Sequence, residues 1–408
     1  MALKNWNDLN MTLGKTRSGT LMPTLPLPNA TGRLEPYRLS EKAIAAGAPG
    51  TPWPRIAYAA AHVVADPLAS VDPWGKAAVD WDATMEYRRH LWSLGFRIAE
   101  AMDTSQRGMG FDWTNAQELI RRSLAEARAI PGADLASGAG TDHLASGSAR
   151  TLQDVTAAYL QQVSFVEGSG GRVILMASRE LARIARGPDD YLRVYGEILR
   201  QCARPVILHW LGEMFDPALA GYWGSRDDAK AAETVLQLIN AHAAKVEGIK
   251  ISLLDAGKEI AFRRRLPQGV LMFTGDDFNY PELIAGDAHG SSHALLGIFD
   301  AIAPAAAAAL SALGRADMQA YRDAFEPTVP LSRRIFEAPT QYYKAGIVFL
   351  AWLNGFQSHF TMLGGMQSAR GLLHYADIFR LADRAGLLRD ADLATRRMAG
   401  LMQVHGVP

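Results

Sequence analysis

Cysteine is almost absent from this chain, because Cys202 is the only one among 408 residues. A single cysteine excludes an intrachain disulfide and any metal cluster built on several thiolates. The chain also lacks an excess of charge of either sign, since 42 Lys and Arg residues balance 42 Asp and Glu residues. Without a basic excess, the counterion release that drives nucleic-acid binding is missing. We therefore expect a small-molecule partner and no nucleic acid.

Long hydrophobic runs are missing as well. The apolar stretch at 301–313 is too short and too rich in alanine to span a membrane. Residues 1–20 mix charged and apolar side chains, unlike a signal peptide. We expect no membrane association and, with one cysteine, a cytoplasmic location. The remaining composition is that of a globular protein, with 49% hydrophobic and 21% charged residues, which is enough apolar material for a sizeable core.

Proline and short apolar runs divide the chain into three parts. Residues 1–52 contain six prolines and little periodicity, which predicts an irregular N-terminal arm. In residues 53–300, short strand-like runs alternate with longer amphipathic stretches, the pattern of repeated βαβ units. Residues 301–408 are rich in Ala and Leu and interrupted by prolines, which predicts a C-terminal helical extension.

Eight runs in the middle part have the length and composition of buried parallel strands. They are 55–64, 96–102, 133–138, 172–176, 205–209, 246–252, 269–274 and 288–292. Helical periodicity appears between them, for example at 116–128 and 231–244. Strands that alternate with helices in this number predict an α/β fold, a (β/α)8 barrel of the TIM-barrel type.

The strand at 246–252 carries a lysine where an interior side chain is expected. Strand alternation places Ile249 and Ile251 toward the helices. Gly248, Lys250 and Ser252 then point into the barrel. Burial favours the neutral amine, which is a nucleophile toward carbonyl carbons and can form a Schiff base. From periodicity alone, a lysine that reaches solvent or pairs with a carboxylate is an equally weighted alternative.

This strand resembles the Gly-Ile-Lys strand of the dihydrodipicolinate synthase/N-acetylneuraminate lyase family, whose lysine forms the Schiff base. Further resemblances follow the family's order along the chain. They are 136–141 for the third-strand turn, 205–210 for the fifth strand, 274–277 for the Ser-Gly-Asp-Asp of the seventh strand, 286–292 for the eighth strand and 343–346 for a C-terminal helix. The resemblance spans about residues 55–395 and indicates a distant branch similar to the synthases. It implies a Schiff-base lyase and, because related barrels are oligomeric, a homo-oligomer.

Two departures change what the resemblance implies. Where the family holds a keto-acid carboxylate with Gly-Thr-Thr-Gly-Glu, this chain has Gly-Phe-Asp-Trp-Thr at 110–114. An aspartate there repels a carboxylate. Asp112 would instead accept hydrogen bonds from hydroxyl groups, and Trp113 would offer a flat face to a sugar-like ligand, although a core position suits Trp113 equally. His209 replaces the family's proton-shuttling tyrosine and could transfer protons itself, or be a buried histidine bonded to a backbone carbonyl.

Polar residues near other strand ends complete the predicted site, because active sites of this fold lie at the carboxyl ends of the strands. Asp276 and Asp277 could orient the substrate or tune Lys250, or they could brace a loop. Arg179 follows the fourth strand and is a candidate substrate contact. Ser291 belongs to the motif of the eighth strand and is a further candidate.

These residues predict retro-aldol cleavage or dehydration of a keto-sugar or another hydroxylated carbonyl compound, with no cofactor besides the lysine. A rival interpretation is a metal-dependent isomerase, epimerase or aldolase, in which Asp112, His209, Asp276 and His289 would bind a divalent metal. A third is a non-catalytic barrel that binds a small molecule.

Overall fold

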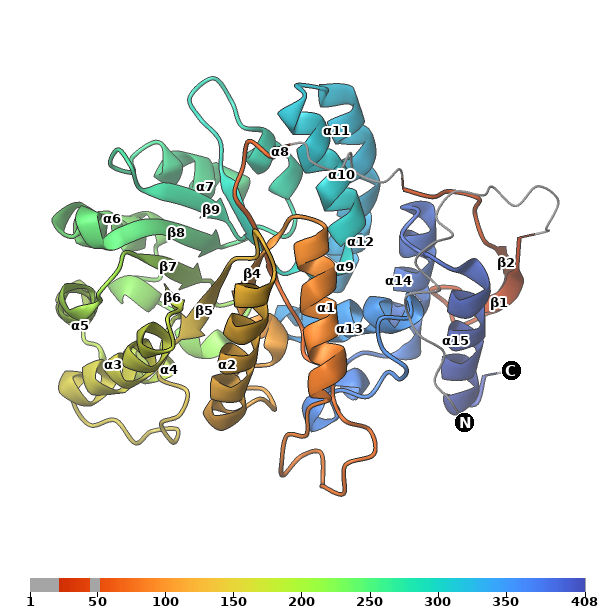
Figure 1. Cartoon of the computed structure of the whole chain (residues 1–408), viewed down its shortest axis with the longest axis horizontal. Coiled ribbons are helices and arrows are strands. Elements are labelled where there is room, and N and C mark those ends of the chain that lie inside the picture. Colours follow the sequence, from red (N-terminus) through yellow and green to blue (C-terminus); the bar gives the residue numbers. More distant parts are fainter. Residues whose placement is uncertain (1–21, 45–51, 408) are drawn as a thin grey trace.

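A computed structural model of the chain describes residues 22–44 and 52–407. Its centre is a closed barrel of eight parallel strands, in the order β10-β3-β4-β5-β6-β7-β8-β9, with helices between them (Figure 1). The predicted (β/α)8 barrel is therefore confirmed. The strands are β3 (Ala57–Ala60), β4 (Arg97–Glu100), β5 (Leu135–Ala139), β6 (Arg172–Leu175), β7 (Val206–Leu211), β8 (Val246–Ser252), β9 (Leu271–Thr274) and β10 (His293–Leu296).

Helices follow seven of these strands on the outside of the barrel, and a group of helices follows the eighth (Figure 1). The outer helices are α1 (Trp81–Ser93), α2 (Trp113–Ala129), α3 (Leu152–Gly168), α4 (Arg179–Ile184), α5 (Pro188–Gln201), α6 (Asp228–Ala241), α7 (Ala256–Arg263) and α8 (Tyr280–Ala285). The C-terminal helices are α9 (Ile298–Ala301), α10 (Ala303–Gly314), α11 (Met318–Phe325), α12 (Val329–Ile335), α13 (Tyr343–Leu353), α14 (Leu372–Arg384) and α15 (Ala391–Val404). The predicted C-terminal helical extension is confirmed.

The eighth strand lies later in the chain than predicted. Residues 288–292 form a loop, in which Gly290 has a φ of +136° and its amide donates to Asp287 O at 3.2 Å. The strand is the apolar run that follows, β10, which pairs with β3 and β9. The loop precedes this strand, so it lies at the amino end of the barrel. The prediction for 288–292 was wrong because small polar residues were assigned to the strand in place of the Ala-Leu-Leu run beside them.

Buried apolar residues form two clusters, one on the outer side of the barrel strands and one inside the barrel. Ile249 and Ile251 belong to the core between strands and helices, as the alternation of β8 predicted. The barrel interior holds a smaller cluster made of Tyr58, Ala60, Ala99, Met102, Ala136, Ile174, Met176, Ile207, Phe273 and Leu295. Gly248 makes room for it, because a Cβ there would lie 2.7 Å from the ring of Phe273. The interior below Lys250 is thus a packed layer and not a channel.

Part of the N-terminal arm is regular, contrary to the prediction. The strands β1 (Thr24–Pro28) and β2 (Leu34–Arg38) form an antiparallel hairpin beside α14 and α15, away from the barrel (Figure 1). Tyr37 donates to Asp383 Oδ2 at 2.7 Å, and the Ser40 amide donates to the same carboxylate at 3.0 Å. The remaining residues of the predicted arm, 1–21 and 45–51, lie outside the described part of the chain.

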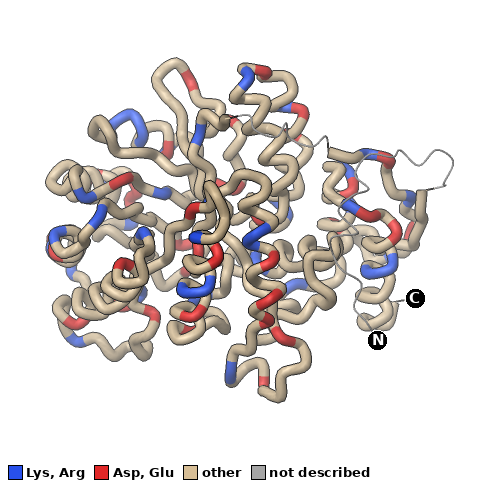
Figure 2. Tube along the Cα trace, viewed as in Figure 1, with Lys and Arg blue, Asp and Glu red and all other residues tan. Residues whose placement is uncertain are grey.

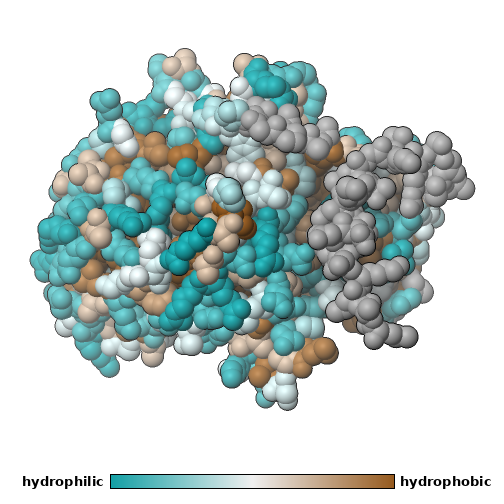
Figure 3. Space-filling model, viewed as in Figure 1, coloured by the Kyte–Doolittle hydropathy of each residue, from teal (hydrophilic) through white to brown (hydrophobic). Residues whose placement is uncertain are grey.

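Charges are mixed over the face in view (Figure 2), in line with the balanced composition. Hydrophilic residues dominate that surface, and apolar side chains gather on the loop between β3 and α1, which projects at the bottom of Figures 1 and 3. Leu68 and Trp74 on this loop are 92% and 91% exposed. Across residues 22–44 and 52–407, none of the helices combines the length and the apolar character that crossing a bilayer requires.

A buried ion pair joins α1 to the barrel. Arg88 Nη2 lies 2.8 Å from Glu100 Oε1 in β4, and both side chains are fully buried. Glu100 also accepts from Ser123 Oγ at 2.5 Å, and Arg88 donates to His62 O after β3. The pair therefore connects α1, α2 and the ends of β3 and β4 in one network, and the remaining lone pairs of the carboxylate are satisfied.

Candidate active site

Lys250 lies inside the barrel, near the carboxyl end of β8. The residue is 7% exposed. In the part of the chain that the structure describes, its ammonium has no hydrogen bond and no carboxylate within 4.0 Å. Burial lowers the pKa of Lys250, and the Asp277 and Asp103 carboxylates oppose this shift. A buried lysine without an ion pair is the form suited to attack a carbonyl carbon.

Two polar side chains share the interior with Lys250. His209 in β7 pairs in register with Lys250, and its Nε2 lies 3.2 Å from Ser252 Oγ. Its Nδ1 is buried without a partner among the described residues. Burial and the nearby Lys250 hold the pKa of His209 well below its usual value. The imidazole is therefore neutral at pH 7, and its buried Nδ1 makes no hydrogen bond with the described residues.

The two aspartates after β9 have different surroundings. Asp276 Oδ1 accepts from the Phe278 and Asn279 amides at 2.9 and 3.0 Å, and its Oδ2 accepts from Asn279 Nδ2 at 2.8 Å. Asp276 therefore stabilises the loop after β9, which is one of the two roles that the sequence allowed for it. Asp277 accepts from the Ile298 amide at 2.9 Å. Burial raises the pKa of Asp277 to about 7, and Lys250 opposes the shift, so Asp277 can exchange protons near neutral pH.

Asp103 and Thr104 follow β4 directly, at the carboxyl end of the barrel. Asp103 is partly buried, and its carboxylate has no hydrogen bond or ion pair within the described ranges. Its charge acts on Lys250. Thr104 Oγ1 lies 2.8 Å from the hydroxyl of Tyr343, the first residue of α13. A carboxylate without a partner among the described residues therefore acts on Lys250, and the residue next to it in the chain contributes to a pair of hydroxyl groups.

A second buried lysine comes from the C-terminal extension. Lys344 on α13 is 3% exposed, and its Nζ donates to Gln341 O at 3.0 Å and contacts Met109 Sδ at 3.5 Å. Burial lowers the pKa of Lys344 to about 8, while Asp103 raises it. The charge of Asp103 thus acts on both lysines. The C-terminal helices complete the site that the barrel begins.

Asp112 and Trp113 lie at the start of α2 and not beside Lys250. Asp112 is exposed and caps the helix, since its carboxylate accepts from the Asn115 amide at 2.8 Å. Trp113 is 8% exposed, and its ring lies 5.4 Å from the Phe165 ring. It is a core aromatic, the alternative that the sequence allowed. Residues 103–109 lie between β4 and this segment, so Asp103 is the first carboxylate after the strand and Asp112 caps the helix that follows.

Ser291 and His289 are placed away from Lys250. Both lie in the loop before β10, at the amino end of the barrel, and His289 is exposed. This separates His289 from His209 in the interior and from Asp112 on α2. Among residues 22–44 and 52–407, no group of three or more His, Cys, Asp or Glu side chains is arranged to hold a metal ion. The four ligands of the metal-dependent alternative therefore do not come together.

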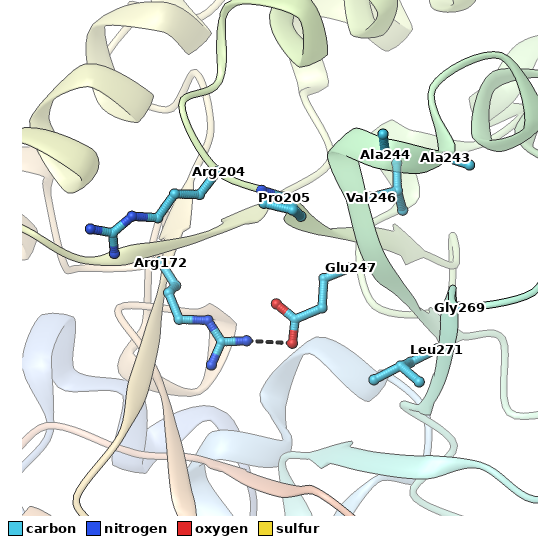
Figure 4. Close-up of a pocket in the computed structure, with 9 residues that line it drawn as sticks. All are labelled: Arg172, Arg204, Pro205, Ala243, Ala244, Val246, Glu247, Gly269 and Leu271. Atoms are coloured by element: carbon cyan, nitrogen blue, oxygen red, sulfur yellow. Dashed lines mark hydrogen bonds and ion pairs between the residues drawn. The ribbon is translucent and has the colours of Figure 1, made fainter.

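The amino end of the barrel carries a pocket of ≈ 530 Å³, shown in Figure 4. It is lined by the first residues of β6, β8 and β9 and the segments before them. Arg172 and Glu247 point toward each other across it and form an ion pair (Figure 4). Arg172 Nη1 also lies 2.9 Å from Asp134 Oδ2. These pairs close the end of the barrel opposite to Asp103 and Asp277. Catalysis in this fold takes place at the carboxyl ends, so the pocket is not the candidate active site.

Gly275 lets the chain after β9 pass directly over Lys250. Its amide donates to Ile251 O at 2.8 Å. A Cβ at this position would lie 2.7 Å from Lys250 Cε and would collide with Ser252 Oγ. The absence of a side chain at residue 275 therefore determines where the amine of Lys250 lies.

Gly275→Ala is expected to displace Lys250 and to slow its reaction with a carbonyl probe by at least about tenfold, because small misplacements of reacting groups are costly. Overpacking is also expected to destabilise the fold by about 1–3 kcal/mol. Intact mass after reduction of the adduct measures the first effect, and denaturant unfolding measures the second. Gly400→Ala is the control, since a Cβ at Gly400 meets no atom within 4 Å. Wild-type reactivity of Gly275→Ala would contradict this role.

Sequence reasoning missed Asp103, Tyr343 and Lys344. Asp103 directly follows the predicted strand 96–102, and that adjacency was the signal available. Tyr343 and Lys344 were noticed only as part of a resemblance to C-terminal helices. No sequence signal places the start of α13 against Thr104 and Met109, because those contacts depend on how the extension packs.

Comparisons with known proteins agree with this architecture. Residues 25–407 match the model of a family described as "Protein of unknown function (DUF993)". The structure is similar to dihydrodipicolinate synthase from Aquifex aeolicus, with a TM-score of 0.62, 11% identity, and 82% of this chain and 100% of that chain covered. It is also similar to the synthase from Thermotoga maritima, with a TM-score of 0.61 and 14% identity. That match covers 82% of this chain and 99% of the synthase. None of the curated proteins matches the chain. The resemblance seen in the sequence is thus confirmed at the level of the fold.

Proposed function

The chain belongs to the family described as "Protein of unknown function (DUF993)", and from its site we propose that it is a Schiff-base-forming lyase of the class I aldolase or dehydratase type. The observation that carries the proposal is Lys250, a buried amine without an ion pair at the carboxyl end of β8. The similarity of the fold to dihydrodipicolinate synthases supports it.

In the proposed reaction, Lys250 Nζ attacks the substrate carbonyl carbon, and water leaves to give an iminium ion. A base removes the proton of a hydroxyl group two carbons away, the C–C bond breaks, and its electron pair moves toward the iminium nitrogen to give an enamine and a carbonyl product. The enamine is protonated on carbon, and water then releases the second product and the free lysine. In the dehydration variant, proton loss beside the iminium expels hydroxide from the next carbon.

Asp277 and His209 are the groups proposed to move protons. The pKa of Asp277 lies at about 7, which suits exchange near neutral pH. His209, predicted from the sequence as the shuttle, is neutral and bonded to Ser252. It is proposed to accept a proton only transiently, beside the iminium nitrogen.

A hydroxylated carbonyl compound is the proposed substrate class. Asp103 offers a free carboxylate that can accept hydrogen bonds from hydroxyl groups, and Thr104, Tyr343 and Ser252 supply hydroxyls. The role that the sequence suggested for Asp112 therefore passes to Asp103. Two expectations remain predictions of the sequence. One is the homo-oligomer that the family resemblance implies, and the other is the cytoplasmic location.

The test is intact mass spectrometry after borohydride reduction in the presence of a panel of 2-keto acids and keto-sugars. A stable adduct on wild-type protein, mapped to Lys250 by peptide analysis, is the expected result. Its mass reports the retained fragment of the substrate. No adduct with any carbonyl compound would refute the Schiff-base class and leave a barrel that binds a small molecule without this chemistry.

A further inference from the structure

Lys344 is a buried cation without a carboxylate partner. It is 3% exposed, and no Asp or Glu oxygen of the described residues lies within 4.0 Å of its Nζ. Its Nζ donates to Gln341 O, contacts Met109 Sδ and lies 4.6 Å from the centre of the Tyr343 ring, so none of these contacts is with an anion. A buried ammonium in this state is costly unless an anion joins it.

Arg179 stands near Lys344 at the same end of the barrel. It begins α4 after β6, and its Nε donates to Asp216 Oδ2 at 2.5 Å. Its two terminal nitrogens have no hydrogen bond in the described part of the chain. Nη1 would lie 3.1 Å from a Cβ at Gly108, so the guanidinium rests on the loop that also carries Met109. The charges of Arg179 and Asp216 both act on Lys344.

We propose that Lys344 and Arg179 form a subsite for an anionic group, a carboxylate or a phosphate, carried by the carbonyl substrate of Lys250. This inference rests on the proposed function and adds to it the class of substrate. A single anion can accept hydrogen bonds from Lys344 Nζ and from the terminal nitrogens of Arg179, and hydrogen bonds between charged groups are the strong ones.

Two carboxylates, Asp216 and Asp103, act on this subsite. Asp216 is paired with Arg179. The charge of Asp103 acts on both Lys250 and Lys344. The neutral amine of Lys250 becomes a positively charged iminium ion when it reacts. A bound anion stabilises that positive charge. Met109, flanked by Gly108 and Gly110 with φ of +69° and +107°, contacts the Lys344 ammonium at 3.5 Å.

The test uses matched probes that differ only by the anion. Dihydroxyacetone phosphate is compared with dihydroxyacetone, and pyruvate with hydroxyacetone, by the concentration that gives half-maximal borohydride-trapped adduct. In wild-type protein one anionic probe is expected to be favoured over its neutral partner by about tenfold to about a hundredfold, the range of a hydrogen bond to a charged group. The pair with the larger ratio shows whether the anion is a phosphate or a carboxylate.

Lys344→Met is expected to bring that ratio close to one, Arg179→Gln to lower it, and Lys344→Arg to retain most of it. Lys245→Met is the control, because Lys245 donates to Cys202 O just before β8, at the other end of the barrel. It is expected to keep the wild-type ratio. A ratio close to one in wild-type protein, or a ratio that Lys344→Met leaves unchanged, would overturn the subsite.

A second readout separates this inference from the proposed function. The rise in Tm produced by each probe is measured without borohydride, for wild type and Lys344→Met. If no adduct forms but an anionic probe raises Tm only when Lys344 is present, the subsite stands and the Schiff-base function falls. If adducts form on Lys250 without any preference for anions, the function stands and the subsite falls. If neither signal appears, both are overturned.

Discussion

Lys250→Met is expected to abolish borohydride-trapped adducts and to lower turnover of the substrate by at least about a thousandfold, the scale on which loss of a nucleophile acts. Methionine keeps the length and apolar stem of the side chain but has no amine. Because the lysine is buried beside a packed interior layer, the variant is expected to fold as wild type does, which a denaturant titration checks.

The pH dependence of trapping gives an independent measure of Lys250. Only the neutral amine reacts, so the rate rises as the pH passes through the pKa of Lys250. Burial lowers that pKa below the ordinary 10.5 of lysine. The rise is therefore expected at a lower pH than for an exposed lysine, such as one in an unstructured peptide measured alongside.

Two outcomes would contradict the assignment of Lys250. An adduct that persists in Lys250→Met and maps to Lys344 would identify the other buried amine as the nucleophile. Unchanged turnover in Lys250→Met would exclude a Schiff base at this position altogether. Lys245→Met serves as the control for removal of a lysine elsewhere in the barrel, and it is expected to behave as wild type.

Arg88→Met is expected to destabilise the protein by about 3–5 kcal/mol, because it leaves the carboxylate of Glu100 buried without a counter-charge. Denaturant unfolding measures the free energy. The neighbouring residue offers a matched control, since Arg89 lies on the same helix and pairs with Glu126 at 2.8 Å, with 48% of its side chain exposed. Arg89→Met is expected to change stability by no more than about 1 kcal/mol.

A double variant separates loss of the pair from loss of packing. Arg88→Met combined with Glu100→Gln removes both charges, so it is expected to recover part of the stability lost in Arg88→Met. If Arg88→Met and Arg89→Met proved equally mild, the network of α1, β3 and β4 would not depend on this ion pair.

The alternation of β8 shows that the direction of side chains within a strand can be predicted from the sequence. Side chains in a strand alternate with a period of two, which is a local property. The segment 246–252 was therefore enough to predict that Lys250 points inward and Ile249 outward, and the structure confirms both. His209 was selected differently, because it stands where the resembling family has its proton-shuttling tyrosine. The barrel itself followed from the succession of strands and helices, since parallel strands joined by helices have few ways to close.

The position of the eighth strand could not be predicted from local sequence patterns. Two adjacent segments, 288–292 and β10, could each have supplied it, and a shift of a few residues moves Ser291 and His289 from one end of the barrel to the other. The choice depends on which segment pairs with β3 and β9. Register is fixed by pairing and packing with distant strands, which a single segment does not encode.

By itself, the sequence determined the α/β class, the closed series of strands, and the inward lysine of β8, because each depends on periodicities within short segments. Only the tertiary structure decided which carboxylate stands beside that lysine, since Asp103 and Asp112 both follow β4 and the path of the loop chooses between them. It also decided that Tyr343 and Lys344 complete the site. Their place depends on α13 packing against the segment after β4, where Tyr343 meets Thr104 and Lys344 meets Met109, contacts over 239 and 235 residues of chain that no local pattern records.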